Sequence, residues 1–268
     1  MDDFLVAKVT ISDLFKIKSK GEKFACLTAY DATFSHLISQ CGIEVILVGD
    51  SLGNVIQGHK TTLQVTVKNM AYHTACVTKI EPQSLVITDL PFMSYPHSDE
   101  AIKTAATMMR SGAEMVKVEG GQWLSSIIFD LVERGIPVCG HLGLTPQSFH
   151  MLGGYKVQGR NEAEAATILS DALSIQEAGA SLLVLECVPE TLASEISAKL
   201  KIPVIGIGAG PNTDGQVLVL HDMLGLATNS PSFSKDFLRD ADSVTTAIKD
   251  FLNSVKNREF PEEINWYS

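Results

Sequence analysis

The sequence lacks the cysteine patterns, long apolar runs and targeting signals that mark several classes of protein. Its five cysteines stand singly, with no Cys-x-x-Cys pair and no Cys/His spacing typical of a metal site, so we expect buried thiols in a reducing compartment. No apolar run approaches the length of a membrane span, and the N-terminus has no basic segment followed by an apolar one. We therefore expect a soluble, cytoplasmic protein.

Positive charge is also scarce, because 21 Lys and Arg residues face 31 Asp and Glu residues and leave a formal net charge of −10. Such a surface repels polyanions, so neither nucleic acid nor an anionic membrane is an expected partner. Long linkers rich in Pro, Gly or Ser are missing too, and 45% hydrophobic residues supply ample core material. We expect one domain over residues 1–268, with a polar C-terminal tail at about 259–268.

The sequence does contain a regular alternation of apolar runs and helical patterns. This alternation predicts a parallel sheet, and near-continuous apolar runs are typical of strands covered on both faces. Eight β-type runs lie at about 23–30, 44–50, 85–91, 115–119, 137–141, 181–187, 203–207 and 216–221. Eight such units predict a (β/α)8 TIM barrel, with a doubly wound open sheet as the alternative.

The helical patterns lie between the runs, at 32–41, 66–80, 98–111, 122–134, 161–178 and 190–200. Residues 235–256 predict a final amphipathic helix, and residues 10–20 predict an extra N-terminal helix that plugs the bottom of the barrel. Only about ten residues separate the seventh and eighth runs, which is barely a crossover. A short seventh helix, a single turn near 211–215, is therefore expected.

Three consecutive runs each end in an acid, namely Asp50, Asp89 and Glu119. In a barrel these strands are neighbours, so three carboxylates converge on one rim and repel one another unless a cation or protons hold them. Oxygen ligands with open positions for substrate suit Mg²⁺. The alternative is that Asp50 caps the following segment and Glu119 pairs with Lys117.

Lys117 stands two residues before Glu119, so both side chains point to the same face of their strand. A buried lysine beside carboxylates stays charged and can hold a substrate carboxylate. A Schiff-base lysine needs a lowered pKa, and adjacent acids act in the opposite direction. We therefore favour the electrostatic role for Lys117.

Glu186 ends the most apolar strand, and an apolar environment makes it a candidate general base near neutral pH. Its alternative role is a structural ion pair with a neighbouring strand. His141, in an apolar strand, is expected to contact substrate or to position a neighbouring residue. The glycines of the loop 153–160 indicate a mobile segment that could close over the site.

These motifs resemble the ketopantoate hydroxymethyltransferase family from about residue 8 to about 258. The two most specific stretches are HLGLTPQS at 141–148 and GGYKVQGR at 153–160. The shorter matches are TAYD at 28–31, VGDS at 48–51, DLPFM at 89–93, VKVEGG at 116–121 and LECVP at 185–189. One departure is Ser232, which stands where the family usually has a basic residue after Pro231.

The resemblance implies an enzyme that transfers a hydroxymethyl group from 5,10-methylenetetrahydrofolate to 3-methyl-2-oxobutanoate and makes ketopantoate, on the route to pantothenate and coenzyme A. It implies a Mg²⁺ bound by Asp50 and Asp89, with Glu119 near it, directly or through water. Ser51 and Lys117 would bind the 2-oxo acid directly. Asp50 and Asp89 would bind it through the metal. Glu186 would accept a proton. A homo-oligomer, a decamer, is implied as well.

Three other interpretations remain open. A Mg²⁺-dependent lyase or mutase of the phosphoenolpyruvate mutase and isocitrate lyase group also binds 2-oxo acids, but typically carries a reactive loop cysteine. A Schiff-base aldolase would use Lys117. A barrel that only binds a metabolite is disfavoured by the complete set of acids.

Overall fold

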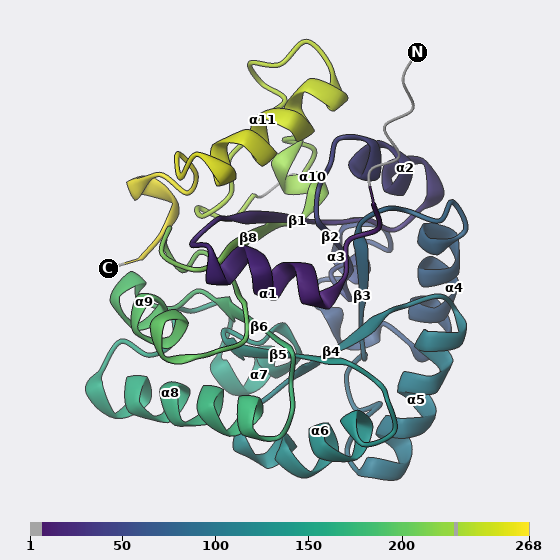
Figure 1. The fold of residues 1–268 in the computed structure, drawn as a ribbon, viewed down its shortest axis with the longest axis vertical. Helices are drawn as coiled ribbons and strands as arrows, with labels where there is room; N and C mark the ends of the chain where they lie inside the picture. The colour runs from purple at the N-terminus through teal and green to yellow at the C-terminus, as the bar shows by residue number, and fades with distance from the viewer. Residues whose placement is uncertain (1–6, 228–229, 268) are drawn as a thin grey trace.

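Eight parallel strands close into a barrel in chain order in the computed structural model, which describes residues 7–227 and 230–267 (Figure 1). They are β1 Phe24–Thr28, β2 Val45–Val48, β3 Leu85–Asp89, β4 Met115–Glu119, β5 Val138–Gly143, β6 Leu182–Glu186, β7 Val204–Ile207 and β8 Gly215–Leu218. β8 pairs with β1, with Phe24 opposite Gly215, and this pairing closes the sheet. The predicted (β/α)8 barrel is confirmed, and the open sheet is excluded.

Helices surround the barrel as an outer layer, and short ones lie in the loops (Figure 1). They are α1 Ile11–Ser19, α2 Ala32–Gln40, α3 Leu52–Val55, α4 Val67–Thr78, α5 Ser98–Arg110, α6 Ser125–Val132, α7 Phe149–Leu152, α8 Glu162–Glu177, α9 Glu190–Lys199, α10 Leu220–Met223 and α11 Val244–Lys256. The 3-10 turns are η1 Thr62–Gln64, η2 Gln122–Leu124, η3 Pro146–Ser148 and η4 Glu263–Asn265. Within the described ranges, no helix is long and apolar enough to cross a membrane.

The strands form because their side chains are buried on both faces of the sheet. Every residue of β1, β2, β3 and β4 is buried, including the polar Thr28, Thr88 and Lys117. Strand side chains that point outward pack under the helices, while those that point inward fill the centre of the barrel. The ends of the strands are therefore the places where polar side chains can reach a cavity.

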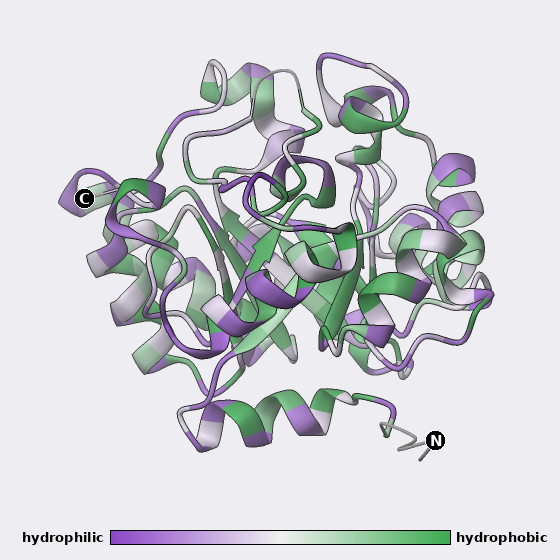
Figure 2. Cartoon of the chain, turned by 90° about the horizontal axis from the view of Figure 1, so that it is seen from above, coloured by the Kyte–Doolittle hydropathy of each residue, from purple (hydrophilic) through white to green (hydrophobic). Residues whose placement is uncertain are grey.

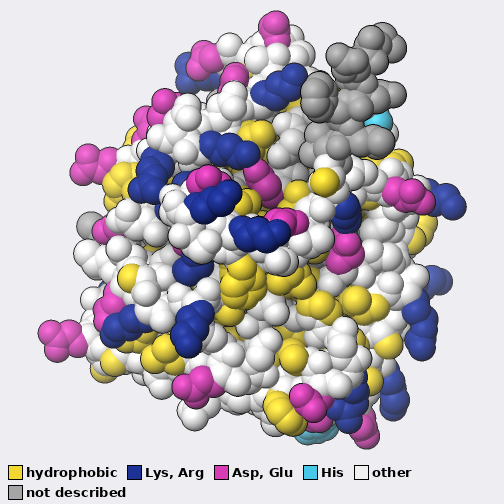
Figure 3. Space-filling view, viewed as in Figure 1, with side chains coloured by type: hydrophobic (Ala, Val, Ile, Leu, Met, Phe, Trp, Pro, Cys, Tyr) yellow, Lys and Arg dark blue, Asp and Glu magenta, His cyan; other side chains and the backbone are white. Residues whose placement is uncertain are grey.

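Helix α1 lies across the amino-terminal ends of the strands, apart from the outer ring (Figure 2). The backbone of Val9 donates to Gln83 just before β3, and Lys18 Nζ lies 2.7 Å from Asp214 Oδ2 just before β8. Leu14 is fully buried beneath the helix, and Lys and Arg side chains gather on the outer side (Figure 3). The predicted N-terminal plug is confirmed, and the carboxyl ends of the strands remain free for a site.

Several features differ from the predictions. The connection from β7 to β8 holds a turn at residues 211–214 and no helix, so the predicted short seventh helix is wrong. Helix α11 begins at Val244 and not at 235, because Ser243 caps it by accepting from Thr246 N at 3.1 Å. The C-terminal tail is less polar in its contacts than predicted, since Phe260 is buried and Tyr267 forms a β-bridge with Pro189.

Candidate active site

The carboxyl ends of the strands open into a cavity of about 1260 Å³. Every site residue predicted from the sequence lines it: Asp50, Ser51, Asp89, Lys117, Glu119, His141 and Glu186. Strand register explains the convergence, because Asp89 lies opposite Lys117 across β3 and β4, and Glu119 lies opposite His141 across β4 and β5. The structure therefore brings the predicted set together.

Asp50 and Asp89 form a buried pair of acids. The backbone N–H of Asp50 donates to Asp89 Oδ2 at 2.9 Å, and each residue is at most 3% exposed. Burial raises the pKa of both carboxyl groups, and for Asp50 the nearby charges of Asp89 and Glu119 add to the rise. The pair thus carries more negative charge than its surroundings compensate, and a bound cation would relieve it.

Lys117 compensates part of that charge. Its Nζ lies 3.2 Å from Asp89 Oδ1 and 3.6 Å from Glu119 Oε1, and the residue is 4% exposed. Burial opposes its protonation, but Asp89 and Glu119 outweigh burial and raise the pKa of Lys117 above its usual value. The lysine stays charged, which suits an electrostatic anchor and disfavours a Schiff base.

Glu119 is held by protein donors at both of its oxygens. Its Oε1 lies 3.0 Å from His141 Nδ1, and its Oε2 accepts from the backbone N–H of Gln147 at 2.9 Å. Burial acts to raise the pKa of Glu119, but His141 and Lys117 reverse the effect and lower it. Glu119 is therefore an ionised carboxylate that is fixed in place and already satisfied.

His141 joins Glu119 to Glu186. Its Nε2 lies 3.3 Å from Glu186 Oε2, an ion-pair distance without hydrogen-bond alignment. Burial and Lys117 oppose protonation of the ring, yet the two glutamates outweigh them and raise the pKa of His141. The Glu186 side chain is 15% exposed, so its carboxylate opens to the cavity.

Gln147 ties these acids together and was not identified from the sequence. Its Nε2 donates to Asp50 Oδ2 and to the carbonyl of Leu90, both at 2.9 Å, and its Oε1 accepts from Tyr95 Oη at 2.6 Å. The only available signal was its place inside the HLGLTPQS stretch. The side chain of Gln147 thus fixes the orientation of Asp50, and its backbone N–H fixes the orientation of Glu119.

Ser51 follows Asp50 at the cavity wall, where its Oγ lies 2.9 Å from Tyr30 Oη. The carbonyl of Tyr30 in turn lies 2.7 Å from His73 Nδ1 on α4. Ser51 is thus positioned by a buried aromatic side chain that follows β1, and its hydroxyl is available beside the acid pair.

The residues present fit a hard divalent cation held mainly by two carboxylates. Asp89 Oδ1 is buried without a hydrogen bond, and Asp50 receives one side-chain hydrogen bond, from Gln147. The described part of the chain holds no cluster of three or more His, Cys, Asp or Glu arranged to bind a metal. A cation of the Mg²⁺ class would complete such a site with water and substrate oxygens.

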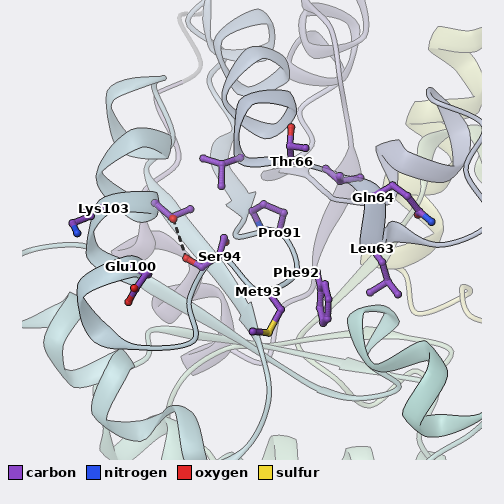
Figure 4. Close-up of a pocket in the computed structure, with 12 residues that line it drawn as sticks. Leu63, Gln64, Thr66, Pro91, Phe92, Met93, Ser94, Glu100 and Lys103 are labelled. Atoms are coloured by element: carbon purple, nitrogen blue, oxygen red, sulfur yellow. Dashed lines mark hydrogen bonds between the residues drawn. The ribbon is translucent and has the colours of Figure 1, made fainter.

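A second hollow, of about 490 Å³, lies away from these residues between the start of α4 and the loop after β3 (Figure 4). Leu63, Pro91, Phe92 and Met93 line it, together with Thr104, whose Oγ1 donates to the carbonyl of Ser94 at 2.9 Å. It contains none of the converging acids. The chemistry therefore belongs to the larger cavity.

Solved structures with similar folds belong to another group of barrels. Phosphoenolpyruvate phosphomutase from Streptomyces platensis matches with a TM-score of 0.61 at 14% identity, covering 93% of this chain and 94% of that one. A 2,3-dimethylmalate lyase matches with a TM-score of 0.59 at 15% identity, over 81% of this chain and 80% of the other. At these identities the likeness concerns the fold alone.

Sequence comparisons are far closer. The chain is 54% identical to 3-methyl-2-oxobutanoate hydroxymethyltransferase of Psychromonas ingrahamii over 96% of this chain and 97% of the other. It is 52% identical to the protein of that name in Buchnera aphidicola, over 95% and 97%. The family model for ketopantoate hydroxymethyltransferase matches residues 8–263. The predicted transferase activity is confirmed, and the chain belongs to the ketopantoate hydroxymethyltransferase family.

Proposed function

We propose that this hydroxymethyltransferase takes its one-carbon unit from 5,10-methylenetetrahydrofolate, binds 3-methyl-2-oxobutanoate against Mg²⁺, and releases ketopantoate. The observation that carries the proposal is the convergence of two buried acids, a charged lysine and a more accessible glutamate on one cavity. One barrel of similar fold, phosphonopyruvate hydrolase, forms a crystalline complex with oxalate and Mg²⁺, which is the same ligand chemistry in that protein.

Asp50 and Asp89 hold the cation in this proposal. A divalent cation there supplies a Lewis acid that draws electron density from the keto group of the substrate. Glu119 influences the cation indirectly, through water or through Lys117, because both of its oxygens already accept from protein donors. Gln147 keeps Asp50 aimed at the cavity.

Lys117 and Ser51 hold the 2-oxo acid. Lys117 supplies a fixed positive charge for the substrate carboxylate, and Ser51 supplies a hydroxyl that Tyr30 positions at 2.9 Å. These contacts restrict the substrate to one orientation, with C3 toward the opposite wall. Glu186 stands on that wall, on β6.

Glu186 removes the C3 proton. The electron pair of the broken C3–H bond then forms the new bond to the one-carbon unit, as the first of its two bonds to the folate nitrogens N5 and N10 breaks. One water then replaces the second nitrogen on that carbon and supplies the product hydroxyl. The C3 proton and the remaining water proton end on the two nitrogens, so the balanced products are ketopantoate and tetrahydrofolate. His141, 3.3 Å from Glu186, orients the carboxylate and stabilises its charge before it accepts the proton.

The reaction itself tests the proposal. Purified protein is supplied with 3-methyl-2-oxobutanoate, 5,10-methylenetetrahydrofolate and Mg²⁺, and ketopantoate is measured. We expect product that disappears with EDTA and returns with added Mg²⁺. Absence of product with every divalent metal would overturn the proposal. Product that persists in EDTA together with borohydride trapping of Lys117 would replace it with Schiff-base chemistry.

We also propose a cytoplasmic homo-oligomer, a decamer as the family resemblance implies, with no nucleic acid or membrane partner. Large apolar side chains are exposed on the described surface, among them Tyr72 at 66%, Met93 at 64% and Phe129 at 55%. Apolar side chains that form one contiguous exposed patch are typical of contacts between subunits, so these residues are candidates for such contacts, and the decamer itself rests on the family resemblance. Light scattering during gel filtration measures the mass, and a monomer would contradict the proposal.

A further inference from the structure

Asp222, on α10 after β8, is a buried acid of the same cavity that the proposed roles leave unused. It lines the cavity and is 8% exposed. Among the described residues, no side-chain hydrogen bond or ion pair involves its carboxylate. Burial alone raises its pKa to about 6. Its oxygens are not among the fully buried atoms that lack a hydrogen bond, so they are open to the cavity, where a ligand that donates to them would bind favourably.

The surroundings of Asp222 connect it to the oxo-acid site. The ring of the adjacent His221 lies 5.7 Å from the ring of Tyr30, whose hydroxyl contacts Ser51 at 2.9 Å. In the closed barrel β8 neighbours β1 and stands across from β4, which carries Lys117 and Glu119. A ligand over Asp222 would therefore lie beside the oxo acid, on the side away from Lys117.

The wall near Asp222 is apolar and aromatic. Leu226 follows α10, Phe233 packs against Gly208 after β7, and Tyr267, whose Oη lies 3.0 Å from Ser232 Oγ, lines the same cavity. The cavity volume of about 1260 Å³ is much larger than a five-carbon acid requires. This part of the cavity thus suits a flat, largely apolar ring with hydrogen-bond donors on one edge.

The pterin ring of a folate has that edge. Its 2-amino group and N3–H are adjacent donors that match the two oxygens of a carboxylate, whereas 3-methyl-2-oxobutanoate has no N–H donor. Bidentate hydrogen bonds to a charged acceptor are strong and geometrically specific. We infer that Asp222 recognises the 2-amino-4-oxopyrimidine edge of the folate in this cavity, an inference that rests on the proposed function.

Basic side chains in the loops after β2 and β5 fit the other end of a folate. Lys60, Lys156 and Arg160 line the cavity and are exposed, and within the described residues none of them forms a salt bridge. The glutamate tail of a folate carries carboxylates that such cations attract. The pterin ring beside α10 and the tail toward the 153–160 loop give the folate one direction across the cavity.

The test compares the full-length enzyme with Asp222→Asn, which keeps the side-chain size but removes the charge and one acceptor. Folate kinetics are measured at saturating 3-methyl-2-oxobutanoate and Mg²⁺. Exchange of the C3 proton of the oxo acid is measured by NMR in D₂O without folate. We expect kcat/KM for 5,10-methylenetetrahydrofolate to fall about 30-fold or more, mainly through KM, with exchange within about twofold of wild type.

Two comparisons make the result specific. Asp240→Asn makes the same change at an exposed acid in the segment after α10, and it should alter neither measurement. A 5,10-methylenetetrahydrofolate analogue without the 2-amino group should lose most of its kcat/KM with the wild type but little more with Asp222→Asn. Such non-additivity assigns the lost contact to that amino group.

Three results would overturn the inference: unchanged folate kinetics in Asp222→Asn, an equal loss of exchange and transfer, or additive effects of variant and analogue. Fluorescence titration with tetrahydrofolate measures the same contact without catalysis, and Asp222→Asn should weaken binding about 30-fold or more. The wild type could bind tetrahydrofolate more tightly than Asp222→Asn and still make no ketopantoate. That result would count against the proposed function and not against this inference.

Discussion

The two sides of the cavity differ in whether their acids contact other polar or charged groups of the protein. On the side of β2 to β5, Asp50, Asp89, Lys117, Glu119 and His141 are all within 3.6 Å of a partner in the same cluster. On the side of β8, no side chain among the described residues bonds or pairs with the Asp222 carboxylate. Single buried atoms without a hydrogen bond occur on both sides, namely Asp89 Oδ1, His141 Nε2 and His221 Nδ1.

This difference indicates a division of tasks. Charges that must be in place before a proton moves are positioned by the protein, which avoids reorganisation during the reaction. A carboxylate without a protein partner is instead completed by its ligand, so it acts in recognition. The β2–β5 side is prepared for chemistry, and the β8 side for binding.

The strongest test of the prepared side is Asp50→Ala. We expect metal-dependent turnover to fall at least about 1000-fold, because one of two cation ligands is lost. The fold should survive, since the change removes one of two repelling buried acids. Ketopantoate formation and a thermal melt measure the two effects. Near-normal turnover would remove Asp50 from the metal site.

Glu186→Gln separates binding from proton transfer on the same side. The amide cannot accept the C3 proton, so exchange in D₂O should fall about 100-fold to 10,000-fold. Binding of 3-methyl-2-oxobutanoate in the presence of Mg²⁺, followed by calorimetry, should change little. Wild-type exchange in this variant would reject the base assignment.

Gln147→Ala tests whether the network positions the acids. Asp50 and Tyr95 would lose their partner, and we expect kcat to fall about 10-fold to 100-fold and unfolding free energy to fall by about 1–3 kcal/mol. Gln122→Ala, at an exposed position, is the control. If Gln147→Ala changes stability but neither kcat nor the Mg²⁺ dependence of turnover, the residue is structural only.

The smallest effect is expected from the pH dependence of stability on the β8 side. The folded-state pKa of Asp222, about 6, lies above the unfolded value near 3.8, so its ionisation opposes folding as pH rises through that window. Asp222→Asn should therefore gain stability relative to wild type between about pH 4 and pH 7, by at most about 1 kcal/mol because cavity water screens the charge. Denaturant titrations of both proteins at about pH 4 and about pH 7 measure this gain in the free energy of unfolding. A difference between variant and wild type that is the same at the two pH values would contradict the assignment.

The sequence by itself determined the barrel and the positions of its acids. Buried parallel strands require continuous apolar runs, and polar residues concentrate where such strands end, so eight runs and their terminal acids could be recognised from local pattern. The upward shift of the Lys117 pKa also followed from the acids predicted beside it, Asp89 and Glu119. The family resemblance came from long motifs and needed no structure.

Only the tertiary structure decided which groups complete the site. Gln147 reaches Asp50 across 97 positions of sequence, and Tyr267 reaches Ser232 across 35, so no local pattern contains either contact. The sequence predicted a strand up to about residue 221, whereas β8 ends at Leu218 and Asp222 lies on α10 in the cavity wall. Local periodicity determines which residues are buried, but the partners of a buried polar atom depend on chain closure over long separations.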